Sequence, residues 1–247
     1  MPAKTADKCK RSRISNRCVA GVDGCRAGWV AVLLYGNNAV DVVMVNAFAE
    51  LLQNHLAAAD AIAVDMPIGL ATRGRRGCDA LARKALGRGR SSSVFAAPRR
   101  GMLACATYEE ANAFGKAQGA DAGGGLSKQA WHILPKIREV DEAIQPSDQM
   151  RIFEAHPEAA FLRLGEGVPP PKKTPEGRQA RIGILTNHGL DAKAILQKLG
   201  DAKGVATDDA LDAAALALTA RDRLSGTAKR YSDEIRDARG LVMEIWG

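Results

Sequence analysis

The stretch CVAGVDGCRAGWVAVLLYGNNAVDVVMV, residues 18–45, decides the fold. Its first apolar run, Cys18–Val22, predicts a strand, the glycine-rich segment after it predicts a turn, and Trp29–Tyr35 predicts a second strand. Gly36-Asn37-Asn38 has the chemistry of a hairpin turn and leads to a third predicted strand at Val40–Val45. The stretch therefore predicts three strands joined as an antiparallel meander.

The remainder of the chain predicts an α/β protein with a helical insertion. Apolar residues at helical spacing over 48–56 precede a short buried strand at Ala61–Asp65, which suggests a parallel crossover back into the sheet. Further helices are expected at 78–86, 107–118, 127–144, 175–187, 191–199 and 207–223, and further strands at Arg151–Ala155 and Leu241–Trp246. The helical interval is longer than one crossover helix requires, so we expect an inserted helical cap at about 71–145. We expect one domain over 18–247, preceded by a disordered basic tail at 1–17.

The net charge of +7 is unevenly distributed. Residues 1–17 carry +5, and residues 73–100 hold nine Lys or Arg against Asp79 alone, so the remainder is acidic. Localised positive charge beside an acidic remainder is typical of a protein that binds a polyanion, and nucleic acid is the expected partner. The alternative is an ordinary solvated basic surface.

Several classes of protein are disfavoured. No apolar run approaches the roughly 20 residues needed to cross a bilayer, and the N-terminus lacks the apolar region of a secretory signal. The five cysteines form no Cys-x-x-Cys pair and are odd in number, which argues against a disulfide framework or a thiolate zinc site. We expect a cytoplasmic protein without membrane association, and the sequence does not indicate its oligomeric state.

Aspartates stand where a folding chain would normally place apolar residues. Asp23 and Asp65 follow the apolar runs of the first and fourth predicted strands, and ligands of open α/β sheets collect at the carboxyl ends of strands. Each is also typical of a turn residue when considered alone. Asp212 lies inside the apolar run Ala210–Ala220, and Asp209 shares its helix face. An unpaired buried carboxylate is costly, so these acids predict a shared cation, and oxygen ligands favour Mg²⁺ or Mn²⁺.

Three of the acids, Asp208, Asp209 and Glu154, also have interpretations that require no metal. Asp208 and Asp209 also suit the first turn of a helix capped by Thr207, because acidic residues favour the helix dipole. Glu154 and His156 share one face of the fifth predicted strand. They are candidates for a metal ligand and for a proton-transfer or phosphate-contacting group, or else form a pair on a water-exposed edge strand.

The chain resembles the DUF429 family, described as predicted ribonuclease-H-like nucleases, from about residue 20 onward. The resemblance rests on these ordered motifs: Gly21-Val-Asp-Gly-Cys-Arg-Ala-Gly-Trp29, Val64-Asp-Met-Pro-Ile-Gly-Leu70, Ser92-Ser-Val-Phe95, Ser127-Lys-Gln, Pro135-Lys-Ile137, Glu139-Val-Asp141, Glu154-Ala-His-Pro-Glu158, Lys172-Lys-Thr-Pro-Glu-Gly177 and Asp208-Asp-Ala-Leu-Asp-Ala213. It implies a ribonuclease-H-like five-stranded mixed sheet flanked by helices. It also implies that acidic residues hold two divalent ions. In this sequence the corresponding residues are Asp23, Asp65, Glu154, Asp209 and Asp212.

The expected function is therefore that of a metal-dependent nuclease that hydrolyses phosphodiester bonds by a two-metal mechanism. The expected substrate contacts come from basic and hydroxyl residues in loops near the acids: Arg26, Arg90, Ser92, Ser93, His156, Lys173 and Arg178. One alternative is a nucleotide-binding phosphotransferase or ATPase on the same superfold, although no Walker-type motif is present. A non-catalytic nucleic-acid-binding module is another, although aromatic stacking residues are scarce.

Overall fold

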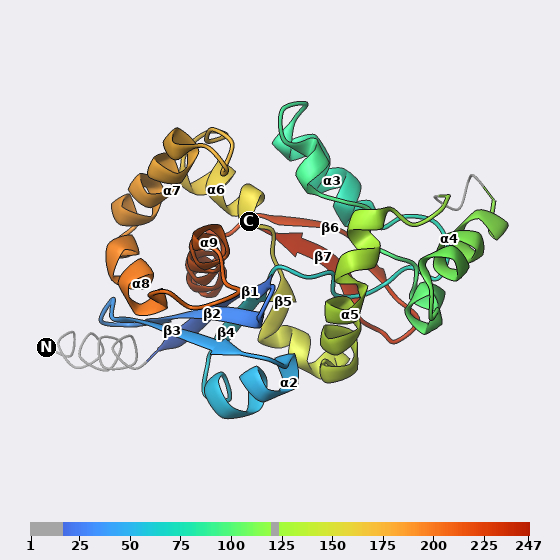
Figure 1. The fold of residues 1–247 in the computed structure, drawn as a ribbon, viewed down its shortest axis with the longest axis horizontal. Coiled ribbons are helices and arrows are strands. Elements are labelled where there is room, and N and C mark those ends of the chain that lie inside the picture. The colour runs from blue at the N-terminus through green and yellow to red at the C-terminus, as the bar shows by residue number, and fades with distance from the viewer. Residues whose placement is uncertain (1–16, 120–123) are drawn as a thin grey trace, which may run out of the picture. The chain divides into compact units, whose positions relative to one another are not determined.

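The structure is a computed structural model of the chain, and it describes residues 17–119 and 124–247. The predicted basic tail lies outside the described residues, apart from Arg17. The chain divides into two compact units. Unit 1 comprises the described residues up to Val64 together with Pro169–Ala228, and unit 2 comprises Asp65–Val168 and Lys229–Gly247. Figure 1 shows the order of the elements along the chain.

Unit 1 contains most of the sheet. Its strands are β1 (Cys18–Cys25), β2 (Gly28–Tyr35), β3 (Val40–Val45) and β4 (Ala61–Val64). Its helices are α2 (Phe48–Glu50), which continues as a π-helical turn at Leu51–His55, α7 (Pro175–Asn187), α8 (Ala192–Leu199) and α9 (Thr207–Ser225).

The sheet has the strand order β3-β2-β1-β4-β5, where β5 is Ile152–Glu154. β2 is antiparallel to both β1 and β3, and β4 is parallel to β1, with Val22 opposite Val64. The predicted meander and parallel crossover are therefore present. The first strand is longer than predicted, because Gly24 pairs with Trp29 and Cys25 pairs with Gly28. The turn between β1 and β2 consequently contains two residues.

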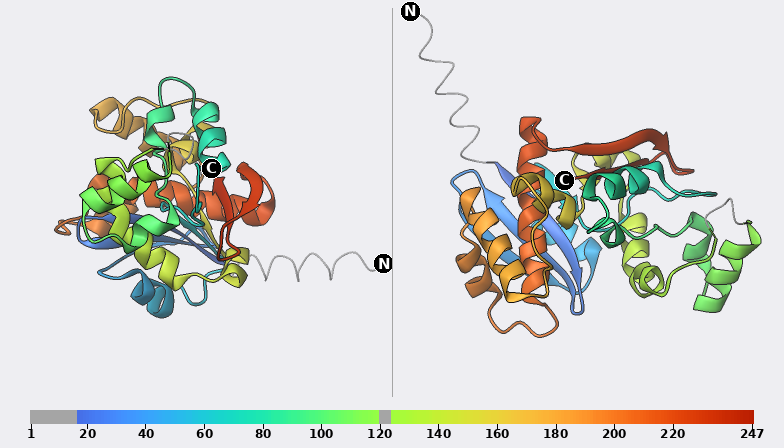
Figure 2. Two further views of the ribbon diagram at one scale, coloured as in Figure 1. Left: turned by 90° about the vertical axis from the view of Figure 1, so that its right-hand side faces the viewer. Right: turned by 90° about the horizontal axis from the view of Figure 1, so that it is seen from above.

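Helix α9 packs directly on β1 in unit 1. A Cβ atom at Gly21 would overlap backbone atoms of Ala213 and Ala217, so only glycine lets the strand and the helix approach this closely. The helix is buried over Ala210–Ala220, and alanine supplies the small side chains that this contact requires. In Figures 1 and 2, α9 covers one face of the sheet of unit 1, and α2 lies on the opposite face.

Unit 2 is mainly helical and is built from two separate segments of the chain. Its helices are α3 (Gly77–Leu86), α4 (Tyr108–Ala117), α5 (Lys128–Ala143) and α6 (Pro157–Leu164), with 3-10 turns at Ser91–Ser93, Arg100–Ala104 and Pro146–Met150. Its C-terminal segment forms an antiparallel ribbon of β6 (Arg230–Arg236) and β7 (Val242–Trp246).

The ribbon of unit 2 shares a core with α3. Cys78 and Ala82 of α3 belong to the same buried cluster as Tyr231, Met243 and Ile245 of the ribbon. The end of the chain therefore packs with residues more than a hundred positions earlier. Among the described helices, none combines the length and the apolar character needed to cross a membrane.

Candidate functional site

Asp212 is the most deeply buried of the predicted aspartates, with 2% of its surface exposed. It lies in α9, and its Oδ2 atom accepts a hydrogen bond from the ammonium group of Lys172 at 2.6 Å. The Lys172 side chain is 40% exposed. A cation of the protein itself therefore reaches this carboxylate from the solvent side.

The loop that carries Lys172 is fixed by α7. The buried Arg181 donates a hydrogen bond to the carbonyl oxygen of Pro170 at 2.8 Å. A Cβ atom at Gly177 would overlap the carbonyl oxygen of Pro171, so glycine lets the loop lie against the start of the helix. Thr174 caps α7 by accepting from the N–H of Gly177 at 3.0 Å. These contacts hold the backbone beside Lys172 in one position.

Asp209 lies in the first turn of α9, close to the same ammonium group. Its Oδ2 atom accepts from the N–H of Ala206 at 2.8 Å. Burial raises the pKa of Asp209, whereas the Ala206 N–H and the positive charge of Lys172 oppose the rise, and the charge of Asp208 adds to it. Lys172 therefore acts on both Asp209 and Asp212. The predicted Thr207 cap is wrong, because Thr207 is the first residue of α9 and Ala206 occupies the cap position.

Asp23 lies on the face of β1 that α9 covers. It is two residues beyond Gly21, so the two residues share one face of the strand. Asp23 is 8% exposed and pairs with Val30 in the sheet. The β1–β2 turn is tied to the segment just before α9, because the N–H of Ala27 donates to the carbonyl oxygen of Gly204 at 3.0 Å. Asp23 and the acidic start of α9 therefore lie at the same end of unit 1.

Asp65 is the first residue of unit 2 and is partly buried. It directly follows Val64, the residue of β4 that lies opposite Val22 of β1. The structure therefore gives the relative placement of the three acids in unit 1, which are Asp23, Asp209 and Asp212. The participation of Asp65 stays a prediction.

The carboxylates do not form a preassembled metal centre. Within 17–119 and 124–247, no three His, Cys, Asp or Glu side chains are grouped so that they could hold a metal ion. The donors of unit 1 nevertheless fit Mg²⁺ or Mn²⁺ in kind, because all are carboxylate oxygens. Asp212 is a buried carboxylate that already has a cationic partner, Lys172, and a metal ion is another cation that could occupy this position. Binding would require Asp212 to exchange Lys172 for the metal ion.

Glu154 does not fit the predicted role of metal ligand. Both of its carboxylate oxygens accept from the guanidinium of Arg76, at 2.6 and 2.8 Å, and one also accepts from the N–H of Ile68 at 2.7 Å. Arg76 is 4% exposed and also pairs with Asp79 at 2.6 Å. Burial opposes the charged form of Arg76, but the carboxylates outweigh it and raise the pKa of the guanidinium. Glu154 is thus the buried counter-ion of Arg76 rather than a residue of a water-exposed edge.

Three of the predicted substrate-contacting residues in unit 2 lie close to one another. The carbonyl oxygen of Ser93 lies 3.3 Å from Nε2 of His156, and because a carbonyl can only accept, Nε2 carries the proton in this contact. Arg90 lies 3.9 Å from Glu158, and Ser92 is exposed. Arg90, Ser93 and His156 therefore belong to one neighbourhood, in which the arginine already faces a carboxylate.

The predicted substrate contacts in unit 1 lie at its surface. Arg26 is exposed in the β1–β2 turn, and Lys173 is exposed beside Lys172. Arg178 lies 3.9 Å from Asp208 at the start of α9. The sequence interpretation selected Lys173, whereas the structure places its neighbour, Lys172, on the buried aspartate. The cost of burying Asp212 without a partner was the signal that could have identified a lysine here.

The basic block at 73–100 is used largely for internal contacts. Five of its nine basic residues bond to groups within unit 2, namely Arg76, Arg83, Arg90, Arg99 and Arg100. The other four are exposed, namely Arg73, Arg75, Lys84 and Arg88. The block therefore presents less free positive charge than its composition suggests, and nucleic-acid binding by it stays a prediction.

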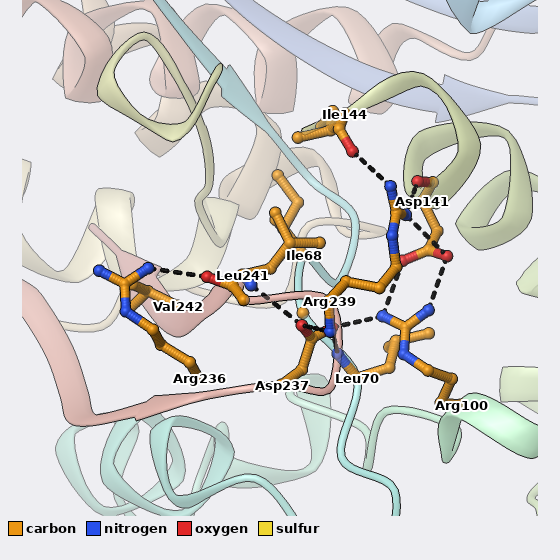
Figure 3. Close-up of polar contacts among 12 residues, drawn as sticks. Ile68, Leu70, Arg100, Asp141, Ile144, Arg236, Asp237, Arg239, Leu241 and Val242 are labelled. Carbon is orange, nitrogen blue, oxygen red and sulfur yellow. Dashed lines mark hydrogen bonds and ion pairs between the residues drawn. The ribbon is translucent and has the colours of Figure 1, made fainter. Parts of the chain in front are cut away.

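A second ionic network in unit 2 centres on Asp237 (Figure 3). Its Oδ1 atom accepts from the N–H groups of Arg239 and Leu241 at 2.8 and 3.0 Å, and its Oδ2 atom accepts from the N–H of Leu70 at 3.0 Å. The guanidinium of Arg100 completes the set and also pairs with Asp141 of α5. One carboxylate thus ties the turn between β6 and β7 to two earlier segments.

This network predicts a loss of stability in acid. Burial acts to raise the pKa of Asp237, but the N–H of Leu70 and the guanidinium of Arg100 outweigh it, so the pKa is lowered. A lowered pKa stabilises the fold above the unfolded-state value of about 3.9, and this stability is lost as the pH falls through the folded-state value. We expect Asp237→Asn to lower the free energy of unfolding at neutral pH by about 1.5–3 kcal/mol, as for a hydrogen bond to a charged group.

Urea unfolding between pH 2 and pH 7 measures this effect. The unsubstituted protein should lose stability below about pH 4, and the Asp237→Asn protein should show a smaller loss over the same interval. Parallel pH profiles for the two proteins would contradict the assignment.

The fold and site define an α/β protein with a five-stranded mixed sheet flanked by helices and a carboxylate pair on α9. The chain belongs to the DUF429 family, described as a protein of unknown function, whose family model matches residues 21–236. Comparisons with curated proteins and with solved structures gave no match.

Proposed function

We propose that this protein is a metal-dependent nuclease with a ribonuclease-H-like fold. The observation that supports this most strongly is the direct packing of α9 on β1, which brings Asp23 to the same end of unit 1 as Asp209 and Asp212. The strand order, with three antiparallel strands followed by a parallel one, is the order that the ribonuclease-H-like assignment requires.

Asp23, Asp209 and Asp212, which all belong to unit 1, would hold Mg²⁺ or Mn²⁺. When bound, the metal supplies a water of lowered pKa and neutralises charge on a phosphodiester. Glu154 is left out of this set because Arg76 and Ile68 occupy its oxygens.

Lys172 acts as the counter-ion of Asp212. Its side chain is 40% exposed, so the ammonium can turn toward solvent when a metal ion takes its place on Asp212. In the substrate complex the ammonium can then contact a phosphate oxygen, together with Lys173 from the same loop. The loop thus supplies positive charge beside the acids of α9.

A cleavage assay tests the proposal. Fluorescently labelled single-stranded and double-stranded DNA and RNA, and a branched DNA junction, are incubated with the protein in Mg²⁺, Mn²⁺ or a chelator. We expect cleavage of at least one substrate in metal and none in chelator. Saturable ATP binding with phosphate release, and no cleavage, would favour the phosphotransferase class instead.

Nucleic-acid binding that persists in chelator and weakens steeply with salt, without cleavage, would indicate a binding module. Either of these two outcomes would overturn the nuclease proposal.

A further inference from the structure

A cavity of about 310 Å³ lies within unit 2, in a region that the proposed function does not use. It is lined by Gly74 and Arg75, by five residues between Phe95 and Met102, and by residues at and just before the start of α5. Its volume is at the lower end of the range of small-molecule sites, about 300–1,000 Å³. The cavity is thus large enough for a small ligand and too small for a nucleic-acid strand.

Two arginines line this cavity. Arg99 is 4% exposed, and its guanidinium donates a hydrogen bond to the carbonyl oxygen of Gly124. Gly115 of α4 makes room for it, because a Cβ atom there would meet the Nη2 atom of Arg99. Arg75 lines the same cavity and is exposed. One guanidinium is therefore fixed by its surroundings, while the other can adjust to a ligand.

The positive charges of Arg75 and Arg99 repel each other. Burial lowers the pKa of Arg99, and the positive charge of Arg75 lowers it further. An anion between them would relieve this repulsion.

The start of α5 adds to the positive potential of the cavity. Ser127, which caps this 16-residue helix, lines the cavity and accepts from the N–H of Ala130 at 3.1 Å. A serine hydroxyl that accepts a hydrogen bond can also donate its own hydrogen. The first N–H groups of a helix lack partners within the helix, and its N-terminus favours negative charge.

Part of the cavity wall is apolar. It is formed by side chains of Phe95, Met102 and Leu126. Such a wall suits a flat or apolar group attached to the anion.

We propose that this cavity binds a small phosphate monoester, whose phosphoryl oxygens contact Arg75, Arg99 and Ser127 and whose organic group packs against Phe95. A phosphate monoester carries a charge of about −1.5 to −2 at neutral pH and three acceptor oxygens, which match two guanidiniums and a hydroxyl. A carboxylate has a single charge and matches this set less well. The site is a ligand site separate from the proposed metal site, whose carboxylates on α9 and β1 belong to unit 1.

Isothermal titration calorimetry with phenyl phosphate, inorganic phosphate and benzoate tests this proposal at low ionic strength in the full-length protein. We expect saturable binding of phenyl phosphate, weaker binding of inorganic phosphate and the weakest binding of benzoate. Arg75→Met should weaken the binding of phenyl phosphate at least about tenfold, as expected for the loss of a charged hydrogen bond. Because Arg75 is exposed, the substitution should leave the fold intact.

Arg73→Met is the matched control, since Arg73 is exposed, lies two residues away and does not line the cavity. It should change the affinity for phenyl phosphate less than twofold. The proposal is overturned if phenyl phosphate does not bind saturably, if benzoate binds as tightly, or if the two variants weaken binding equally. Since no metal or cleavage enters this experiment, its failure would leave the nuclease proposal untouched.

Discussion

Replacing Asp23 with asparagine is expected to lower metal-dependent cleavage at least about 100-fold, because even groups that only support metal ligands cost 10- to 100-fold when they are removed. Asparagine keeps the size of the side chain but removes the negative charge that the metal requires. The carboxylate lies on the β1 face that α9 covers, with 8% of its surface exposed. The rate is measured on the substrate that the cleavage assay identifies, at saturating Mn²⁺.

Asp41→Asn is the control for this variant. Asp41 lies on β3 in the same sheet, is exposed, and pairs with Lys198 at 3.3 Å. The control should cleave at the unsubstituted rate, and both variants should retain the thermal midpoint of the unsubstituted protein. If Asp23→Asn cleaves normally while folded, the site is wrongly assigned.

Replacing Glu154 with glutamine is expected to destabilise the protein by about 3–5 kcal/mol, because it leaves the buried charge of Arg76 with an incomplete set of partners. The glutamine amide would also turn donor groups toward the N–H of Ile68 or the guanidinium. Urea unfolding at pH 7 measures the change. Mn²⁺ affinity, measured on the folded fraction at 10 °C, should stay the same.

Glu142→Gln provides the comparison for Glu154→Gln. Glu142 is exposed on α5 of the same unit, and its replacement should change the free energy of unfolding by less than about 0.5 kcal/mol. A Glu154→Gln protein of normal stability that has lost Mn²⁺ affinity would restore Glu154 to the metal site and refute its role as a structural counter-ion.

The strands and helices that the sequence predicted well are those with strong local signals. The hairpin turn at residues 36–38 is such a signal, because it acts over a few residues and can be recognised without knowledge of the fold. Strand β6 was missed because its sequence RYSDEIR is mostly polar and exposed. It is ordered by pairing with β7 and by packing against α3, neither of which is visible locally.

The division into two units could not be predicted for a related reason. The C-terminal ribbon belongs to unit 2 because Tyr231 and Met243 join the core around Cys78, far away in sequence. No linker composition marks this boundary, since one division falls at the end of β4, between Val64 and Asp65.

The sequence named the acids of the candidate site, but it did not name the side-chain cations that contact them. The cost of burying Asp212 indicated that it needs a positive partner, whereas Glu154 was expected to be a metal ligand or to lie on a water-exposed edge strand. The structure supplies Lys172 for Asp212 and Arg76 for Glu154. Sequence alone could not choose between a metal and a side chain, because these cations lie 40 and 78 residues away along the chain. The two cations differ in burial. Lys172 is half-exposed and can be displaced from Asp212, whereas Arg76 is buried and cannot be displaced from Glu154.

The central claim is that the acids of β1 and α9 bind a divalent ion in place of the Lys172 ammonium. A crystal soaked in Mn²⁺ and measured at the manganese absorption edge tests it directly. We predict an anomalous peak bonded to carboxylate oxygens of Asp23 and Asp212, with Lys172 displaced from Asp212. A fully soaked crystal without such a peak, in which Lys172 still contacts Asp212, would contradict the claim.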